Sequence, residues 1–396
     1  MKNFILFSLL LSIGTVVHAQ RDSLAYRTLF KSVQQKYAPD KRSVYLDVQF
    51  RGDTAFVEST SKAALDALRA ASNDSHYVQV VNLLPSKSLN GMEYGLANLS
   101  VCNNRAAPQN AAEMMTQMIL GTPVQVLKRQ GGFYLVKTPD GYLSWTDATA
   151  VSLMNPDDFN AWRKSDRVIY SADYGHAYTK AKRNSERVSD LVKGNILAVL
   201  GSEKGFFMVR FPDQRVGYIL KSEAQSFQNW KAQKNPDAAR VLTTAKTMIG
   251  VPYLWGGTSL KGVDCSGFTK TSYFLNGIII PRDASQQALV GKPVDVLEGD
   301  STSLDKCLKN LIPGDLLFFS AAKLRGTIGG RVTHTAIYMG EGTFIQSAGM
   351  VRISSLIPTA PNFDARESKT LVGARRILSE IGEAEITRVN QHEWYN

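Results

Sequence analysis

The stretch that most constrains this chain is Gly262-Val263-Asp264-Cys265-Ser266-Gly267-Phe268, shortly after Pro252-Tyr253-Leu254-Trp255-Gly256-Gly257. Residues 269–274 have helical spacing, so Cys265 is predicted to stand where a loop turns into a helix. A thiol in the first helical turn meets free backbone N–H groups and the positive end of the helix dipole, which lower its pKa. The same N–H groups can hold an oxyanion. The alternative is a buried structural cysteine, the commonest fate of a free thiol.

The C-terminal third adds two polar side chains on predicted strands. His334 lies near the start of a strand pattern over 332–340. Gln346 lies in a second strand pattern over 343–347, after a glycine turn. A cysteine at a helix start, a histidine on a strand and a polar residue on the next strand form the nucleophile, base and orienter of a cysteine peptidase. The other histidine of this region, His392, lies in the tail, so His334 is the predicted base.

These stretches resemble the NlpC-type cell-wall peptidases, a papain-like family. The resemblance covers about residues 236–380, through 252–255, 264–268, 313–316, 334–340 and 344–349. It implies an α+β fold: a papain-like catalytic domain whose nucleophile helix packs on an antiparallel sheet. Gln346 stands where relatives often have a second histidine, and its amide oxygen can fix the tautomer of the imidazole. The alternative for Gln346 is an ordinary polar strand residue.

The reaction that this set predicts is acyl transfer through the sulfur. His334 takes the proton of Cys265 to give a thiolate–imidazolium pair, and the thiolate attacks a peptide carbonyl to form an acyl-enzyme. Tyr253 is a candidate to donate its hydroxyl to the oxyanion together with the Cys265 N–H. The alternative for Tyr253 is core packing.

The resemblance is closest to a subgroup with SH3-like barrels that cuts between γ-D-glutamate and a diamino acid in peptidoglycan stem peptides. It implies a stem-peptide substrate with a free N-terminal L-alanine. By this match Asp264 and Ser266 hold the ammonium group, and Glu113 and Tyr142 close its pocket. Four further residues are expected to line the cleft: Trp255, Arg282, Asp283 and Ser285. The alternative for the cleft residues is a cap or turn role, since Asp and Ser are good helix caps.

An internal repeat occupies residues 96–225. Residues 121–127 parallel 194–200, and 132–140 parallel 205–213, with glycine, proline and aspartate turns between short strands. The pattern predicts two small all-β barrels. They resemble bacterial SH3-like barrels. Three roles are open for them: a spacer, a wall-binding module, or one side of the substrate cleft. The predicted domains are a signal peptide (1–19), an α+β module or cap (20–95), two barrels (96–155 and 156–228), the catalytic domain (236–380) and a peripheral tail (381–396). Residues 321–331 are predicted to be a mobile loop.

Composition limits the partners. The net charge is +11, yet no motif of interleaved aromatic and basic residues points to nucleic acid. Lys2, the apolar run 4–11 and Val17-His18-Ala19 form a signal peptide, which predicts an exported, periplasmic or secreted monomer with no transmembrane segment after cleavage. With three cysteines and no Cys/His cluster, no disulfide, metal or cofactor is expected. Two other functions stay open, namely an amidase or acyltransferase on the same fold and a non-enzymatic wall-binding protein.

Overall fold

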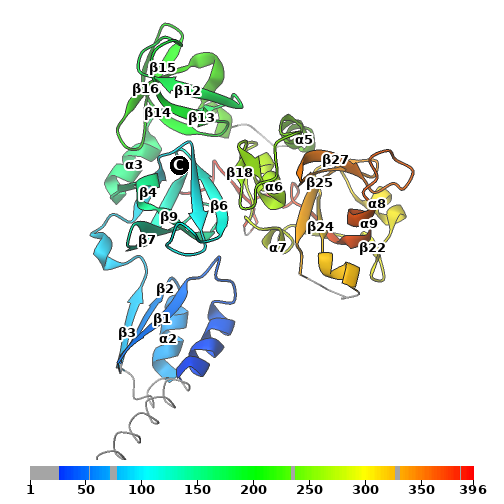
Figure 1. Cartoon of the computed structure of the whole chain (residues 1–396), viewed down its shortest axis with the longest axis horizontal. Coiled ribbons are helices and arrows are strands. Elements are labelled where there is room, and N and C mark those ends of the chain that lie inside the picture. The colour runs from blue at the N-terminus through cyan, green and yellow to red at the C-terminus, as the bar shows by residue number, and fades with distance from the viewer. Residues whose placement is uncertain (1–25, 53, 72–77, 233–236, 326–330, 384) are drawn as a thin grey trace, which may run out of the picture. The chain divides into compact units, whose positions relative to one another are not determined.

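The computed structural model describes residues 26–52, 54–71, 78–232, 237–325, 331–383 and 385–396 (Figure 1). The predicted signal peptide at 1–19 lies outside them. The chain divides into two compact units, one up to Gly91 and one from Met92 to Asn396.

The first unit is a three-stranded sheet with helices packed against it. Strand β1 runs antiparallel to β2, which runs parallel to β3. Helix α2 buries Ala64, Leu65 and Leu68, whose spacing places them on one face of the helix. The elements are a helix at 26–37, β1 (Leu46–Arg51), β2 (Thr54–Ser59), α2 (Lys62–Ala71), β3 (Val78–Leu83) and the 3-10 helix η1 (Lys87–Leu89).

Two seven-stranded sheets open the second unit, and they confirm the internal repeat. The strand order of the first sheet, β10-β4-β7-β8-β9-β5-β6, recurs in the second when it is written β17-β11-β14-β15-β16-β12-β13. Barrel 1 contains β4 (Tyr94–Ala97), β5 (Val101–Arg105), β6 (Met114–Ile119), β7 (Pro123–Gln130), β8 (Phe133–Lys137), β9 (Leu143–Asp147), η2 (Ala148–Ala150) and β10 (Val151–Met154). Barrel 2 contains β11 (Arg167–Tyr170), β12 (Tyr174–Tyr178), β13 (Arg187–Val192), β14 (Ile196–Glu203), β15 (Phe206–Arg210), β16 (Val216–Leu220), η3 (Lys221–Glu223) and β17 (Ala224–Ser226). Helix α3 (Pro156–Lys164) joins the barrels, and α4 (Phe227–Lys231) follows the second.

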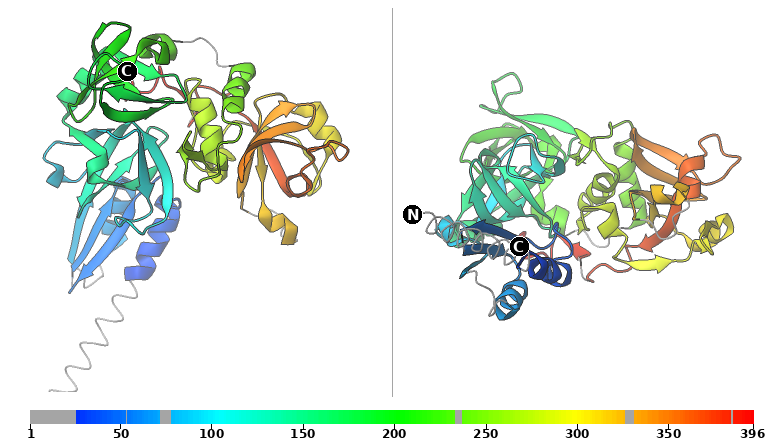
Figure 2. Two further views of the ribbon diagram at one scale, coloured as in Figure 1. Left: turned by 45° about the horizontal axis from the view of Figure 1, so that its top comes forward. Right: turned by 60° about the horizontal axis from the view of Figure 1, so that its bottom comes forward.

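A six-stranded antiparallel sheet, in the order β21-β28-β24-β25-β26-β27, forms the centre of the remaining domain. Figures 1 and 2 show the segment with α6 between the strands of barrel 1 and this sheet. The helices are α5 (Ala238–Thr247), α6 (Cys265–Phe274), α7 (Ala284–Gln287), α8 (Leu304–Asn310), η4 (Ala321–Arg325) and α9 (Ala365–Thr370). The sheet strands are β21 (Lys292–Val294), β24 (Leu316–Phe319), β25 (His334–Gly340), β26 (Thr343–Ala348), β27 (Met350–Ser355) and β28 (Leu371–Arg376). Short pairs are β18 (Thr258–Ser259) with β19 (Gly262–Val263), β20 (Ile278–Ile279) with β29 (Thr387–Arg388), and β22 (Leu297–Glu298) with β23 (Ser301–Thr302).

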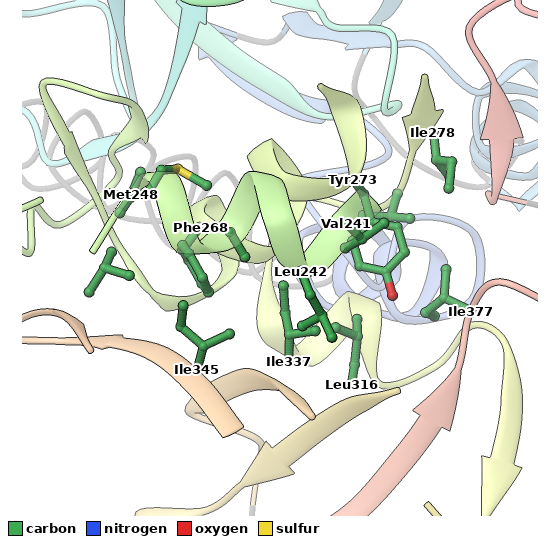
Figure 3. Close-up of a cluster of buried hydrophobic side chains, with 14 of the residues drawn as sticks. Val241, Leu242, Met248, Phe268, Tyr273, Ile278, Leu316, Ile337, Ile345 and Ile377 are labelled. Carbon is green, nitrogen blue, oxygen red and sulfur yellow. The ribbon is translucent and has the colours of Figure 1, made fainter. Parts of the chain in front are cut away.

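Side chains alternate across the central sheet, so that both of its faces are buried. On one face Leu316 and Ile337 pack with Phe268 of α6 and Leu242 of α5 (Figure 3). Neighbouring residues of the same strands, such as Leu317, point to the opposite face beneath α8. The helix that carries Cys265 is thereby held against the strand that begins at His334.

One expectation for the C-terminal part is wrong, and another is not tested. The tail is not peripheral, because Val389 and Tyr395 are buried beside Trp230 and Phe274 in one apolar cluster. Residues 321–325 of the predicted mobile loop form a 3-10 helix, and 326–330 lie outside the described residues. Within the described part of the chain, no helix combines the length and apolar character needed to cross a membrane.

Candidate active site

Cys265 is the first residue of α6, as predicted, and its side chain is buried. Asp264 caps the helix, with Oδ1 accepting the Gly267 N–H at 2.6 Å. Gly267 is required here because a Cβ would lie 1.9 Å from the carbonyl oxygen of Gly257. The glycines of the motif therefore let the preceding loop fold tightly over the first turn that presents the thiol.

The charge state of the thiol differs from the prediction. Burial raises the pKa of Cys265 to about 12, and the Asp264 carboxylate adds to the rise. Backbone hydrogen bonds from Thr335 and Ser266 act in the opposite direction but do not offset burial. The expectation that the helix start lowers this pKa is wrong for the unliganded site, because desolvation outweighs the dipole.

His334 and Gln346 are brought together as predicted. His334 Nε2 lies 2.6 Å from Gln346 Oε1, and the sulfur of Cys265 contacts the backbone of Thr335, the residue after His334. Burial lowers the pKa of His334, and the Glu367 carboxylate and the Gln346 hydrogen bond offset only part of that effect. Both shifts favour the uncharged forms, a thiol and a neutral imidazole, over a thiolate–imidazolium pair.

Tyr253 is half-buried beside these groups. Burial raises its pKa, and the nearby Cys265 and Asp264 raise it further. The phenol therefore keeps its proton at neutral pH and can act as a hydrogen-bond donor.

A buried ion pair sits next to the thiol. Arg282, whose side chain is fully buried, donates to Asp264 through Nη2 at 2.6 Å and Nη1 at 3.1 Å. The same Nη1 donates to Ser266 Oγ at 2.9 Å. Asp264 also accepts the N–H groups of Gly256 and Gly267. These contacts do not support the expectation that Asp264 and Ser266 hold a substrate ammonium group, because the carboxylate already has a cation and two backbone donors.

The other predicted cleft residues form two further contacts between barrel 1 and the catalytic domain. Tyr142 donates its hydroxyl to Asp283 Oδ2 at 3.1 Å. Exposed Trp255 donates its indole N–H to Glu113 Oε1 at 2.9 Å. Ser285 is half-buried on the short helix α7, which Asp283 caps.

Sequence reasoning missed two further residues of barrel 1 that contact this site. Thr116 Oγ1 accepts from Arg282 Nε at 2.8 Å, and Gln117 Oε1 accepts the N–H of Thr258 at 3.0 Å. Both lie on β6, where a polar pair interrupts the apolar run Met114-Met115-Thr116-Gln117-Met118-Ile119. This polar pair in an apolar strand is the sequence feature that could have indicated a contact with another domain. Asp364, which contacts Gln346 at 3.0 Å, was also missed.

Comparisons with known proteins agree with this arrangement. Residues 250–364 match the NlpC/P60 family, and residues 104–151 match the bacterial dipeptidyl-peptidase Sh3 domain. A gamma-D-glutamyl-L-lysine dipeptidyl-peptidase of Bacillus cereus is 27% identical over 68% of this chain and 77% of its own length. A protein of the same name from Bacillus subtilis is 28% identical over 67% of this chain and 82% of its own length.

A solved structure supports the fold. The crystal structure of an NlpC/P60 family protein from Bacillus cereus superposes with a TM-score of 0.58 at 23% identity, covering 72% of this chain and 99% of that one. The predicted papain-like α+β fold is confirmed. The chain therefore contains an NlpC/P60 domain, which carries Cys265 and His334, behind a bacterial dipeptidyl-peptidase SH3 domain.

Proposed function

We propose that this protein is a cysteine peptidase that hydrolyses the γ-D-glutamyl–diamino acid bond of peptidoglycan stem peptides with a free N-terminal L-alanine. The observation that carries the proposal is the placement of Cys265 at a helix start beside the strand of His334, with Gln346 bonded to the imidazole. The names of the relatives support the choice of this bond, and the predicted signal peptide supports a reaction outside the cytoplasm.

The chemistry follows from the neutral resting pair. Gln346 offers its carbonyl oxygen to His334 Nε2, so Nε2 carries the proton and Nδ1 is the base. Nδ1 takes the thiol proton as the sulfur attacks the carbonyl carbon, which avoids a buried thiolate in the free enzyme. Tyr253 and the Cys265 N–H donate to the oxyanion.

The second half of the reaction uses the same base. The imidazolium protonates the leaving amine as the acyl-enzyme forms. His334 then deprotonates a water that attacks the thioester and releases the acid.

We assign the charge of the ammonium pocket to Glu113, with Tyr142 beside it, rather than to Asp264. Glu113 accepts from a neutral indole N–H, so its charge remains available to an ammonium group. Asp283 accepts from the Tyr142 hydroxyl and is paired with Arg282, whose Nη1 lies 3.8 Å from Asp283 Oδ1, so it positions Tyr142 at the pocket. Barrel 1 supplies Glu113 and Tyr142, which favours a barrel that forms one side of the cleft over a simple spacer.

Digestion of purified stem peptides, with fragments weighed by mass spectrometry, tests the proposal. We expect L-Ala-γ-D-Glu as one product and no product from the Cys265→Ala protein. Release of an intact stem peptide from N-acetylmuramoyl-peptide would instead show the amidase. Sedimentation with cell wall without any product would show a binding protein.

A further inference from the structure

The amide of Gln346 has two ends, and only one orientation leaves His334 with the base that the reaction needs. Gln346 is fully buried on β26, with Oε1 toward His334 Nε2 at 2.6 Å. Its amide nitrogen faces away from the histidine and donates to Ser354 Oγ at 2.9 Å and to Asp364 Oδ2 at 3.0 Å. If the amide were reversed, its N–H would point at the ring and Nε2 would have to accept.

Of the two groups on the far side of the amide, Asp364 decides the orientation. The Ser354 hydroxyl can donate or accept, so it tolerates either end of the amide. An ionised carboxylate only accepts, so it requires the nitrogen of Gln346 to face it. Arg352 Nη2 lies 3.3 Å from the same Oδ2, so this oxygen has donors on two sides. A reversed amide would set its oxygen against the carboxylate in a buried site, where like partial charges are costly.

We propose that Asp364 is a positioning residue that selects, through the Gln346 amide, the Nε2–H tautomer of His334 and so leaves Nδ1 as the base for Cys265. The catalytic part of this inference rests on the proposed function. The tautomer itself is a property of the folded protein and is measured without any substrate. The Asp364 carboxylate thus acts on the His334 imidazole indirectly, through the neutral amide of Gln346.

The substitution Asp364→Asn tests this with little change in shape. The carbonyl oxygen of the new side chain can still accept the Glu367 N–H that Asp364 Oδ1 accepts at 3.1 Å at the start of α9. The new NH2 group would then face the NH2 group of Gln346. Because two donors cannot form a hydrogen bond with each other, the Gln346 amide would have to reverse. We expect the 15N NMR signals of His334, at a pH where the ring is neutral, to show the proton on Nδ1 instead of Nε2. On stem peptide, kcat should fall by about 100- to 10,000-fold, as for other wrong-tautomer histidines.

A second substitution restores the pairing. In the double variant Asp364→Asn/Gln346→Glu, the NH2 group introduced at position 364 can donate to one oxygen of the carboxylate introduced at position 346. The other oxygen of that carboxylate accepts from His334 Nε2–H. The double variant should regain the Nε2–H signal and at least about tenfold of the kcat lost in Asp364→Asn, a non-additive result that removal of a helix cap would not give.

The matched control is Asp237→Asn, which makes the same change at the cap of α5, where Asp237 accepts the Arg240 N–H at 2.8 Å. It should keep the Nε2–H tautomer and the wild-type kcat.

An unchanged tautomer in Asp364→Asn overturns the proposal, whatever the effect on kcat. So does a double variant no better than Asp364→Asn. If Asp364→Asn does not fold, Gln346→Glu is compared with the double variant: the two opposed carboxylates of Gln346→Glu should give a kcat at least about tenfold below that of the double variant, and equal rates overturn the idea. A wild-type protein that cleaves no stem peptide refutes the proposed function, while the NMR result still decides the role of Asp364.

Discussion

Both groups that carry the proposed reaction are uncharged in the resting site. Burial raises the pKa of Cys265 to about 12 and lowers that of His334, so each disfavours its own ion. The buried Arg282–Asp264 pair stands beside them as the charged element, and its two charges largely cancel. Proton transfer is therefore expected to accompany attack on the substrate rather than to precede binding.

Removal of the sulfur should abolish turnover without unfolding the protein. Cys265→Ala should lower kcat by at least about 1,000-fold, the order seen when a nucleophile is deleted, while the melting temperature stays near that of the wild type. Peptide turnover and circular dichroism check this. The matched controls Cys102→Ala and Cys307→Ala alter the other buried thiols and should keep near-normal kcat. Loss of activity in either control but not in Cys265→Ala would contradict the assignment.

Alkylation of the free enzyme reports the charge state of the thiol. Iodoacetamide reacts with the thiolate, and a folded pKa of about 12 leaves Cys265 protonated at neutral pH. The inactivation rate should therefore be slow at pH 7 and rise about tenfold per pH unit up to pH 9 and beyond. A rate that is already high and flat between pH 6 and 8 would show a preformed thiolate–imidazolium pair instead.

Much of this site could be predicted from single residues, and part of it could not. The helix start at Cys265 and the strand positions of His334 and Gln346 follow from local spacing and from the family resemblance. The Arg282–Asp264 pair and the Asp364 contact depend on how separate segments pack, and no local pattern encodes those contacts. The pKa of Cys265 was predicted in the wrong direction because the sequence shows the helix start but not the depth of burial.

Among the elements of barrel 1, β6 contacts the segment that leads into the nucleophile helix. Gln117 Oε1 accepts a hydrogen bond from the N–H of Thr258, which lies before α6. In return, Thr258 Oγ1 donates to the Gln117 carbonyl oxygen at 3.0 Å. Gly256 packs so near that a Cβ would lie 2.7 Å from the Met114 carbonyl oxygen. Barrel 1 therefore supports the loop that carries Tyr253 and Trp255.

Gln117→Ala should weaken this support. The substitution leaves the Thr258 N–H buried without its acceptor, which costs about 1–3 kcal/mol. We expect a lower free energy of unfolding and a higher KM for stem peptide, measured by denaturant titration and steady-state kinetics. The control Gln125→Ala, at a half-exposed position on β7 of the same barrel, should change the free energy of unfolding by no more than about 0.5 kcal/mol and leave KM unchanged. Equal effects of the two variants would argue against a role for β6 in the cleft.

The C-terminal segment is an element that sequence reasoning misjudged. It was predicted to be a peripheral tail, yet Tyr395 is 2% exposed, and β29 pairs with β20 just after α6. Arg167 Nη2 also donates to the Tyr395 carbonyl oxygen at 2.9 Å. Two apolar anchors in a polar run do not make a periodic pattern, so the local signal was absent.

Tyr395→Ala should therefore destabilise the protein as a core substitution does. The lost aromatic ring should cost about 3–5 kcal/mol, which thermal or denaturant unfolding would show as a clear fall in stability. Glu393→Ala, two residues earlier and exposed, is the control and should stay within about 0.5 kcal/mol. A Tyr395→Ala protein as stable as the control would restore the peripheral interpretation.

For the whole molecule, the central claim is that barrel 1 and the catalytic domain jointly read a free amino terminus. Glu113 and Tyr142 come from the barrel, and Asp283 and Trp255 come from the catalytic domain. In intact peptidoglycan the stem alanine is amide-linked to glycan, so such a pocket favours released peptides.

A competition assay by mass spectrometry tests this claim most directly, with L-Ala-γ-D-Glu-diamino acid and its N-acetyl form in one mixture. Wild-type protein should cleave the free peptide with a kcat/KM about 10- to 100-fold higher, the value of one charge-assisted hydrogen bond. Glu113→Gln should reduce that ratio toward one by slowing only the free peptide, whereas the control Glu186→Gln on barrel 2 should preserve it. Equal rates on the two peptides with wild-type protein, or an unchanged ratio in Glu113→Gln, would contradict the account.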